Sequence, residues 1–240
     1  MSGDDLAATT APAEREAALL RDRLAEIEVE HATLETELAA FNGDYLRQVM
    51  TVMAELHELE ARVAMLVAER SGSRIDAHSA RAARTRAQET TRVVGAIPPP
   101  AGPAPTGDLK RLFRDAAKLM HPDLAGDDTR MHAEAFMKRL NKAYRAGDAD
   151  AMQNLVRQWE ASPFSALPAE VRAERRADGL RAAVERAQER LEATRASELA
   201  QLMEQAMAAA AAGHDLLAEM RRSAEIALAR ARAQLAELQG

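Results

Sequence analysis

The sequence has no cysteine and very few aromatic side chains. Without thiols, the chain can form no disulfide, no cysteine-based zinc site and no thiol nucleophile. Only 3% of its 240 residues are aromatic, which is typical of long helices and coiled coils rather than of a sheet-based core. The histidines are isolated and not grouped at metal-ligand spacing. We therefore expect an all-α protein that holds no metal and no cofactor.

Long apolar runs are missing as well. No stretch approaches the roughly 18 apolar residues of a membrane-spanning helix, and the alanine-rich run at 206–212 is short. The first residues show no basic start followed by an apolar run, so we expect no secretory signal. These absences predict a cytoplasmic protein without a membrane span, and we expect its residues 1–12 to be disordered.

The net charge of −6 is unevenly distributed along the chain. Residues 1–70 contain 15 acidic and 6 basic side chains, whereas residues 71–107 contain 2 acidic and 5 basic ones. The first region therefore presents an acidic face. No segment has the concentrated positive charge of a dedicated nucleic-acid-binding protein, so we expect no nucleic-acid partner.

Residues 13–70 carry an apolar repeat that predicts coiled-coil helices, because its spacing alternates between four and three residues. Two runs follow this spacing, the first with His31 at one of its steps: Leu20, Leu24, Ile27, Leu34, Leu38 and Phe41, then Val49, Val52, Leu56, Leu59, Val63 and Leu66. The two runs do not share one register. Asn42, Gly43 and Asp44 lie between them and could end one helix and cap the next. We favour an antiparallel helical hairpin, and one long helix with a local defect is the alternative.

Two further regions frame the middle of the chain. Residues 71–107 are expected to form a linker that is arginine-rich and then proline-rich, and a frayed helix is the alternative for Ser71 to Ala96. Pro98, Pro99 and Pro100 exclude a helix in the second part and predict an extended, semi-stiff linker. We expect residues 161–240 to form an alanine-rich helical arm, in which Gly213 either divides two helices or merely weakens one.

Residues 108–160, here called the compact module, predict three short helices. The first, capped by Asp108, has an apolar side and a separate basic stripe, because Lys110, Arg114 and Lys118 are four residues apart; Arg111 lies beside the stripe. Pro122 ends this helix. We expect a second helix over 129–145 and a third that begins after Asp148 and ends before Ser162.

The compact module resembles a J-domain, the signature module of DnaJ-type co-chaperones. His121-Pro122-Asp123 lies in the loop between a basic amphipathic helix and the motif Asn141-Lys142-Ala143-Tyr144, and this combination is far more specific than the tripeptide alone. The resemblance implies that the module docks on a DnaK-type chaperone and stimulates its ATP hydrolysis. It implies that the chaperone contacts His121, Pro122 and Asp123, with Asp123 pairing an arginine there.

The remaining site residues follow from the same resemblance and from charge. Lys110, Arg111, Arg114 and Lys118 would steer the module onto an acidic partner face, and Asn141 would brace the loop through its backbone. The family's usual first helix is absent, because residues 98–107 are proline-rich. Its packing could be replaced by the helix of Met152 to Trp159, by Phe164 and Leu167, or by a piece of the coiled-coil regions.

We therefore expect a co-chaperone, with the coiled coils serving homodimerisation or recruitment of an unknown client protein. We expect no enzyme, because loop residues flanking a rigid proline rarely converge on one proton and no nucleophile or phosphate loop is visible. A structural adaptor whose J-like fold no longer activates a chaperone is the alternative. A third possibility is an envelope- or nucleoid-associated scaffold that binds anionic surfaces through Arg74 to Arg92.

Overall fold

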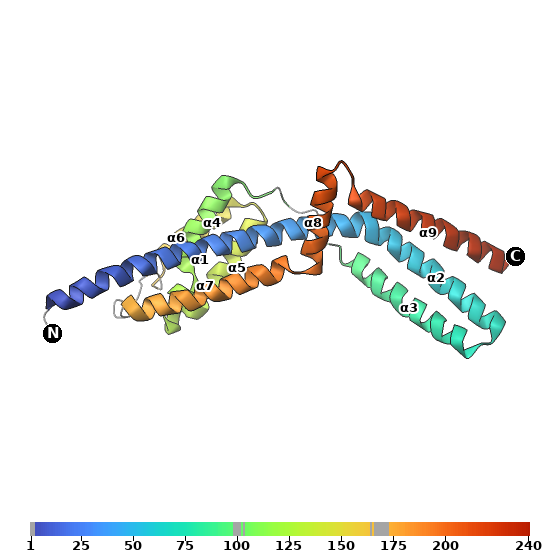
Figure 1. Cartoon of the computed structure of the whole chain (residues 1–240), viewed down its shortest axis with the longest axis horizontal. Coiled ribbons are helices and arrows are strands. Elements are labelled where there is room, and N and C mark those ends of the chain that lie inside the picture. The colour runs from blue at the N-terminus through green and yellow to red at the C-terminus, as the bar shows by residue number, and fades with distance from the viewer. Residues whose placement is uncertain (1–2, 98–101, 103, 164, 166–172) are drawn as a thin grey trace. The chain divides into compact units, whose positions relative to one another are not determined.

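The computed structural model describes residues 3–97, 102, 104–163, 165 and 173–240. Over these residues the chain forms helices and no strand, which confirms the all-α prediction (Figure 1). None of these helices is long and apolar enough to cross a membrane. The chain divides into two compact units, one of Met1–Leu38 with Ala101–Ala200 and one of Ala39–Pro100 with Gln201–Gly240.

The hairpin predicted at residues 42–44 is wrong, because these residues lie inside helix α1 (Gly3–Tyr45). The π-helix η1 (Leu46–Met50) follows directly and leads into α2 (Thr51–Ser71). Asp44 does not cap a new helix; its carboxylate accepts a hydrogen bond of 2.8 Å from Arg47, whose guanidinium lies against Gly43. Helix α1 also begins at Gly3, within the stretch expected to be disordered.

The π-helix explains why the two apolar runs do not share one register. The backbone N–H of Thr51 bonds to the carbonyl of Leu46, five residues earlier, and its hydroxyl donates to Leu46 and Arg47 carbonyls at 3.1 and 2.8 Å. A π-turn inserts one extra residue into a helix and so rotates all later side chains about the helix axis. The alternative of one long helix with a local defect is the one observed.

A helical hairpin does form, but its turn is at Gly72. Helix α3 (Arg74–Gly95) packs along α2, with Ala80 and Ala87 buried, in the region expected to be linker. Gly72 ends α2 in the left-handed conformation with φ of 60°. The side chain of Ser73 caps α3 by accepting bonds from the N–H groups of residues 75 and 76. Of the expected linker, Pro98–Pro100 and Pro103 lie outside the described residues.

The same unit contains most of α8 (Glu198–Ala211) and all of α9 (Leu216–Gln239). Helix α9 runs parallel to α2, because Glu55 pairs with Arg232 at 3.3 Å and Arg70, further along α2, donates to the carbonyl of Leu238. Gly213, with φ of 83°, lies between α8 and α9, so of the two alternatives it divides two helices.

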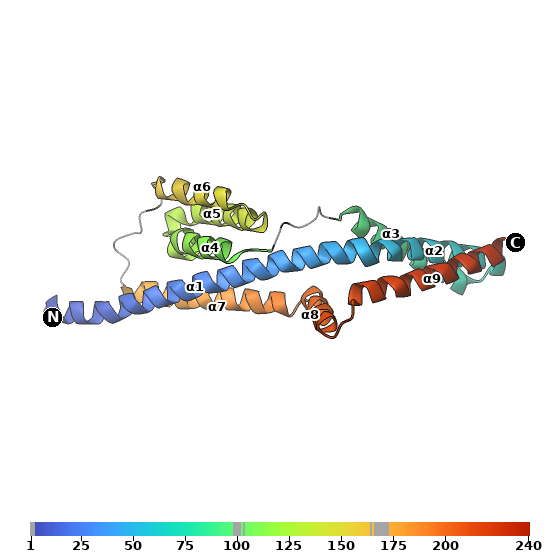
Figure 2. The same ribbon diagram turned by 90° about the horizontal axis from the view of Figure 1, so that it is seen from above.

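The other unit is built on a parallel pair of helices, α1 and α7 (Ala173–Arg195), which lie side by side in Figures 1 and 2. Polar contacts between them keep a nearly constant sequence separation of 162 to 165 residues, as parallel helices require: Glu16–Arg181, Glu28–Arg190 and His31–Thr194. The apolar seam of α1 is therefore buried against α7 of the same chain, with Leu24, Ile27, Leu180 and Leu191 at its centre.

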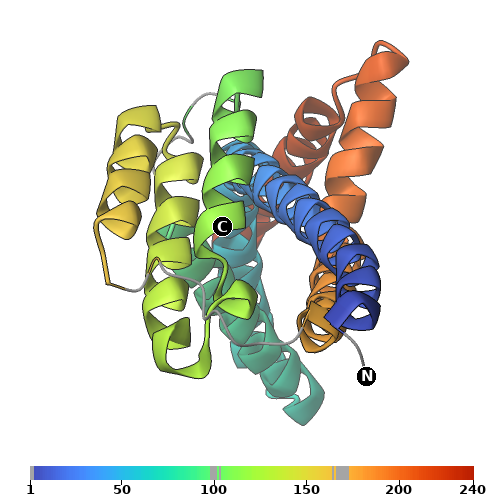
Figure 3. The same cartoon turned by 90° about the vertical axis from the view of Figure 1, so that its left-hand side faces the viewer.

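The compact module packs three helices, α4 (Gly107–Met120), α5 (Asp127–Arg145) and α6 (Ala149–Glu160), side by side (Figure 3). Thr106, and not Asp108, caps α4 by accepting a bond from Leu109 N–H. Asp148 caps α6 as predicted, after Gly147 with φ of 69°.

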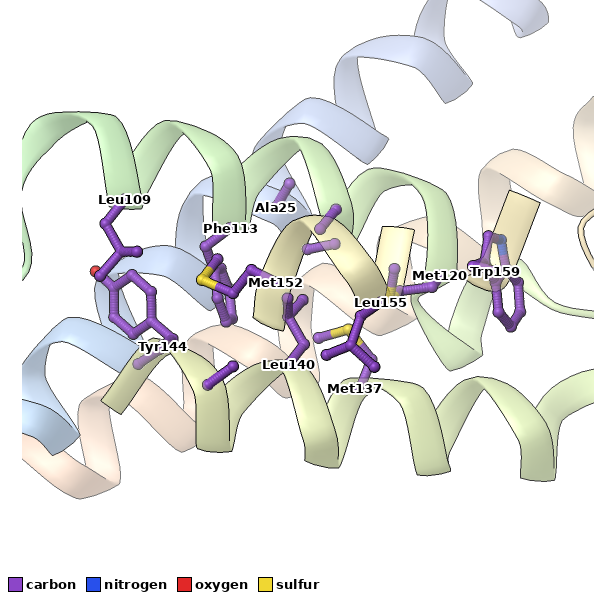
Figure 4. Close-up of a cluster of buried hydrophobic side chains, with 14 of the residues drawn as sticks. Ala25, Leu109, Phe113, Met120, Met137, Leu140, Tyr144, Met152, Leu155 and Trp159 are labelled. Atoms are coloured by element: carbon purple, nitrogen blue, oxygen red, sulfur yellow. The ribbon is translucent and has the colours of Figure 1, made fainter. Parts of the chain in front are cut away.

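Two of the segments considered above as replacements for the family's first helix contribute to the module core (Figure 4). Helix α6 contributes Met152, Leu155 and Trp159 to the buried cluster, and α1 contributes Ala25 and Ala32, with Val29 packed against it. The rings of Phe113 and Tyr144 pack inside it at 4.8 Å between centroids, and the Tyr144 hydroxyl shares a hydrogen bond of 2.7 Å with Thr33 of α1. Phe164 and Leu167, considered above for this role, lie outside the described residues.

We expect Gly72→Ala to destabilise the α2–α3 hairpin by about 1 kcal/mol, because a left-handed conformation is unfavourable for any residue with a Cβ. Amide hydrogen exchange of α2 and α3 measures the change. Gly95→Ala is the matched control, since its φ is not positive and a Cβ there meets no atom within 4 Å. Equal protection in the two variants would contradict the role assigned to Gly72.

Candidate functional site

The loop of His121, Pro122 and Asp123 is a short, rigid connection between α4 and α5. Pro122 disfavours helical geometry in the residue before it, and His121 is extended, with φ of −67° and ψ of 133°. A single 3₁₀ turn, η2 (Pro122–Leu124), follows, closed by a 2.9 Å bond from Leu124 N–H to the His121 carbonyl. The loop therefore presents its side chains in one fixed arrangement.

His121 is buried, with only 5% of its surface exposed. Its Nδ1 accepts a hydrogen bond of 3.1 Å from the backbone N–H of Asp123. The ring proton of the neutral imidazole is then on Nε2, which donates to Oε1 of Glu28 at 3.4 Å. The imidazole thus links the backbone of the loop to a carboxylate on α1.

Glu28 is a buried carboxylate that also accepts a bond of 2.6 Å from Arg190 of α7. Burial raises the pKa of Glu28, but the hydrogen bond from His121 and the charge of Arg190 lower it. His31 adds a smaller lowering effect. The net pKa of Glu28 lies below its ordinary value, so the carboxylate is ionised and joins α1, α7 and the loop.

Asp123 binds two arginines from two different helices. One carboxylate oxygen accepts a bond of 2.8 Å from Arg130 of α5, and the other lies 3.2 Å from the guanidinium of Arg186 of α7. Only 14% of the Asp123 side chain remains exposed. The acid expected to contact an arginine of a partner is therefore already held by arginines of its own chain.

The basic stripe of α4 faces the acidic side of α1. Lys118 forms an ion pair of 2.7 Å with Asp22. Closer to the start of α4, a groove of about 630 Å³ separates the two helices, and charges of opposite sign line its walls. These are Lys110, Arg111 and Arg114 on α4, and Glu26, Glu30 and Glu37 on α1.

The structure thus brings the predicted docking residues together on one side of the compact module: His121, Pro122, Asp123, Lys110, Arg111, Arg114 and Lys118. Arg111 is the most exposed of these basic residues and pairs within its own helix with Asp108.

Asn141 does not brace the loop as expected, since it makes no hydrogen bond to any residue of 121–126 in the described parts of the chain. His121 and Arg130 hold the loop instead.

Sequence reasoning missed the residues that cover this side, namely Asp22, Glu28, Arg186 and Arg190. Part of the signal was visible, because Asp22, Glu26 and Glu30 are four residues apart and so lie along one side of α1. Arg186 and Arg190 of α7 are four residues apart as well, but this spacing does not say which helix they face. Their role depends on the pairing of α1 with α7, which joins residues more than 160 positions apart.

His121 and Asp123 are not arranged as a hydrogen-bonded acid–base pair of side chains. His121 Nδ1 and the nearest Asp123 oxygen are 4.0 Å apart, and the carboxylate is neutralised by two guanidinium groups. Among the residues that the structure describes, no group of three or more histidines and acids is placed to hold a metal ion.

No protein-family model, curated protein or solved structure matches this chain. The function of the site therefore rests on its own geometry and on the motifs that the chain carries.

We expect Glu28→Gln to lower the unfolding free energy near neutral pH by about 1–2 kcal/mol, because it weakens a charged hydrogen bond to Arg190 in a buried setting. A carboxyl whose pKa is depressed by folding stabilises the protein above its unfolded pKa of about 4.3, and this stabilisation disappears as the pH falls through the folded pKa. The difference between wild type and variant should therefore shrink towards pH 3.

Denaturant unfolding followed by fluorescence measures this effect, since the single tryptophan, Trp159, lies in the module core. Glu30→Gln is the matched control, because Glu30 forms a half-exposed pair with Arg195 on the same two helices and such pairs stabilise little. A loss that is the same at pH 3 and pH 7 would contradict the role of the Glu28 charge.

Proposed function

We propose that this chain is a co-chaperone whose compact module, a J-domain-like unit, docks on a DnaK-type chaperone in the cytoplasm and stimulates its ATP hydrolysis. The observation that supports this most directly is the common orientation of the docking groups. His121 and Asp123 are fixed by η2 on the same side of the module as Lys118 and the rest of the basic stripe.

The physical logic of docking follows from these groups. A basic stripe attracts an acidic partner face, raises the association rate and makes the contact sensitive to salt. Asp123 is placed to accept an arginine from outside the module, as its 3.2 Å contact with Arg186 of α7 illustrates. The rigid loop would deliver this carboxylate to the chaperone without a large ordering cost.

The other elements support a recruiting role more than an oligomerising one. The α1 seam, for which homodimerisation was one of two expected roles, is buried against α7 within the chain. The α2–α3 hairpin and α9 form a second helical unit with its own buried cluster around Leu56 and Leu228. We assign to this unit the binding of a client or target protein.

A structural adaptor that no longer activates a chaperone remains the second candidate. It is favoured by one observation, the pairing of both His121 and Asp123 inside the chain. In an adaptor the module would serve as a folded spacer, and the loop of His121, Pro122 and Asp123 would not need to be accessible to a partner.

We expect the full chain, titrated over a DnaK-type chaperone from the same cell, to raise its single-turnover ATP hydrolysis rate. His121→Gln should abolish the stimulation, since the substitution removes the imidazole from the loop. His132→Gln is the matched control, because it makes the same chemical change on the exposed side of α5 and should leave the stimulation intact.

Circular dichroism of both variants checks that the helices are retained. If neither the wild-type chain nor Arg186→Ala, which removes the contact of α7 with Asp123, changes the hydrolysis rate of any such chaperone from that cell, the co-chaperone proposal is wrong and the adaptor is favoured.

A further inference from the structure

We infer that α1 and α7 act as an internal substitute for the chaperone and hold the compact module in a closed, docking-incompetent state. This inference rests on the proposed function and adds its regulation. The contacts that close the module are named here the latch: Asp22–Lys118, Glu28–His121, Arg190–Glu28 and Arg186–Asp123.

The first half of the latch is the acidic side of α1. Asp22, Glu26 and Glu30 recur every four residues and oppose the basic stripe of α4. An acidic surface is what the stripe would need in a chaperone. Helix α1 therefore offers the stripe the same complementarity from within the chain, at high effective concentration.

The second half of the latch is α7. Arg186 contacts Asp123 in place of a partner's arginine, and Arg190 holds Glu28 where it accepts the bond from His121. Leu124, the last residue of η2, packs against the apolar seam between α1 and α7. The loop is thus covered on its charged and its apolar side by the same helix pair.

The latch blocks docking sterically as well as electrostatically. His121 is 5% exposed and the Asp123 side chain 14% exposed, so a chaperone cannot contact either group while the latch is closed. Docking then requires a chain in which the latch is open. The apparent affinity for the chaperone falls in proportion to the open fraction.

The latch is also built to open. Its apolar part on the module core is small, since α1 packs Ala25, Ala32 and the partly buried Val29 there, and alanine buries little area. Its charged part includes ion pairs with one exposed partner, such as Asp22 or Arg186, and each such pair is individually weak and screened by salt. Opening also breaks the Tyr144–Thr33 hydrogen bond and the Arg145–Glu35 ion pair between α5 and α1. Opening leaves the three helices of the module packed on one another.

The test combines two charge reversals that keep the net charge unchanged. Asp22→Lys and Arg186→Glu together place like charges beside Lys118 and Asp123 and leave every proposed docking residue in place. The matched control exchanges a pair that joins α1 to α7 away from the module, Glu16→Lys with Arg181→Glu, and so preserves an attraction there. Arg186→Ala is a milder second variant, used if the double variant fails to fold by circular dichroism.

The first measurement needs no chaperone. Diethyl pyrocarbonate modifies accessible histidines, and mass spectrometry gives the rate at His121 separately from the other histidines. We expect the rate at His121 to rise on the order of tenfold in the double variant, and less in Arg186→Ala, because reactivity follows the open fraction. The control pair should match wild type. An unchanged rate at His121, or an equal rise in the control, would overturn the latch.

The second measurement is stimulation of the chaperone ATPase by the same chains. The double variant should reach half-maximal stimulation at a concentration lower by on the order of tenfold, following the same open fraction. Equal stimulation by wild type and a double variant with accessible His121 would overturn the latch. If His121 becomes accessible but no chain stimulates hydrolysis, the latch contacts are real and the proposed function is the part that fails.

Discussion

The carboxylate of Glu28 is the interaction on which the functional part of this chain depends. It is buried, ionised, and bonded at once to His121 of the loop and Arg190 of α7. A buried charge of this kind is tolerated only while its partners remain in place. Glu28 therefore couples three elements, so that the position of α7, the course of α1 and the orientation of the loop imidazole depend on one another.

Much of the local structure could be predicted from the sequence. The helices of the compact module, the turn at Gly147 and the cap at Asp148 follow from rules that involve only neighbouring residues. The apolar residues of the α1 seam were also identified, because a repeat of four and three marks a buried helix side whatever covers it. His31 illustrates this, since the polar step in the seam is satisfied by Thr194 of α7.

What could not be predicted depended on pairing over long distances or on competition between local signals. Asn42, Gly43 and Asp44 are residues that favour turns, yet the helix continues through them. Arg47 donates a hydrogen bond to the Asp44 carboxylate, and the π-turn that follows accommodates the shift in register between the two apolar runs. The repeat in α1 does not reveal whether its partner is another copy or another part of the chain. The cover over His121 and Asp123 follows from that pairing, so the site residues were identifiable and their burial was not.

The parallel register of α1 and α7 has a consequence for how the chain is made. Their contacts join residues 162 to 165 positions apart, and contacts of such high sequence separation form late in folding. During synthesis from the N-terminus, α1 and the compact module are complete before α7 has emerged. The apolar seam of α1 is then without its partner, and a second nascent chain nearby could pair with it. Until α7 is synthesised, two copies of the chain can therefore misassemble through their α1 seams. This risk ends once α7 of the same chain covers the seam.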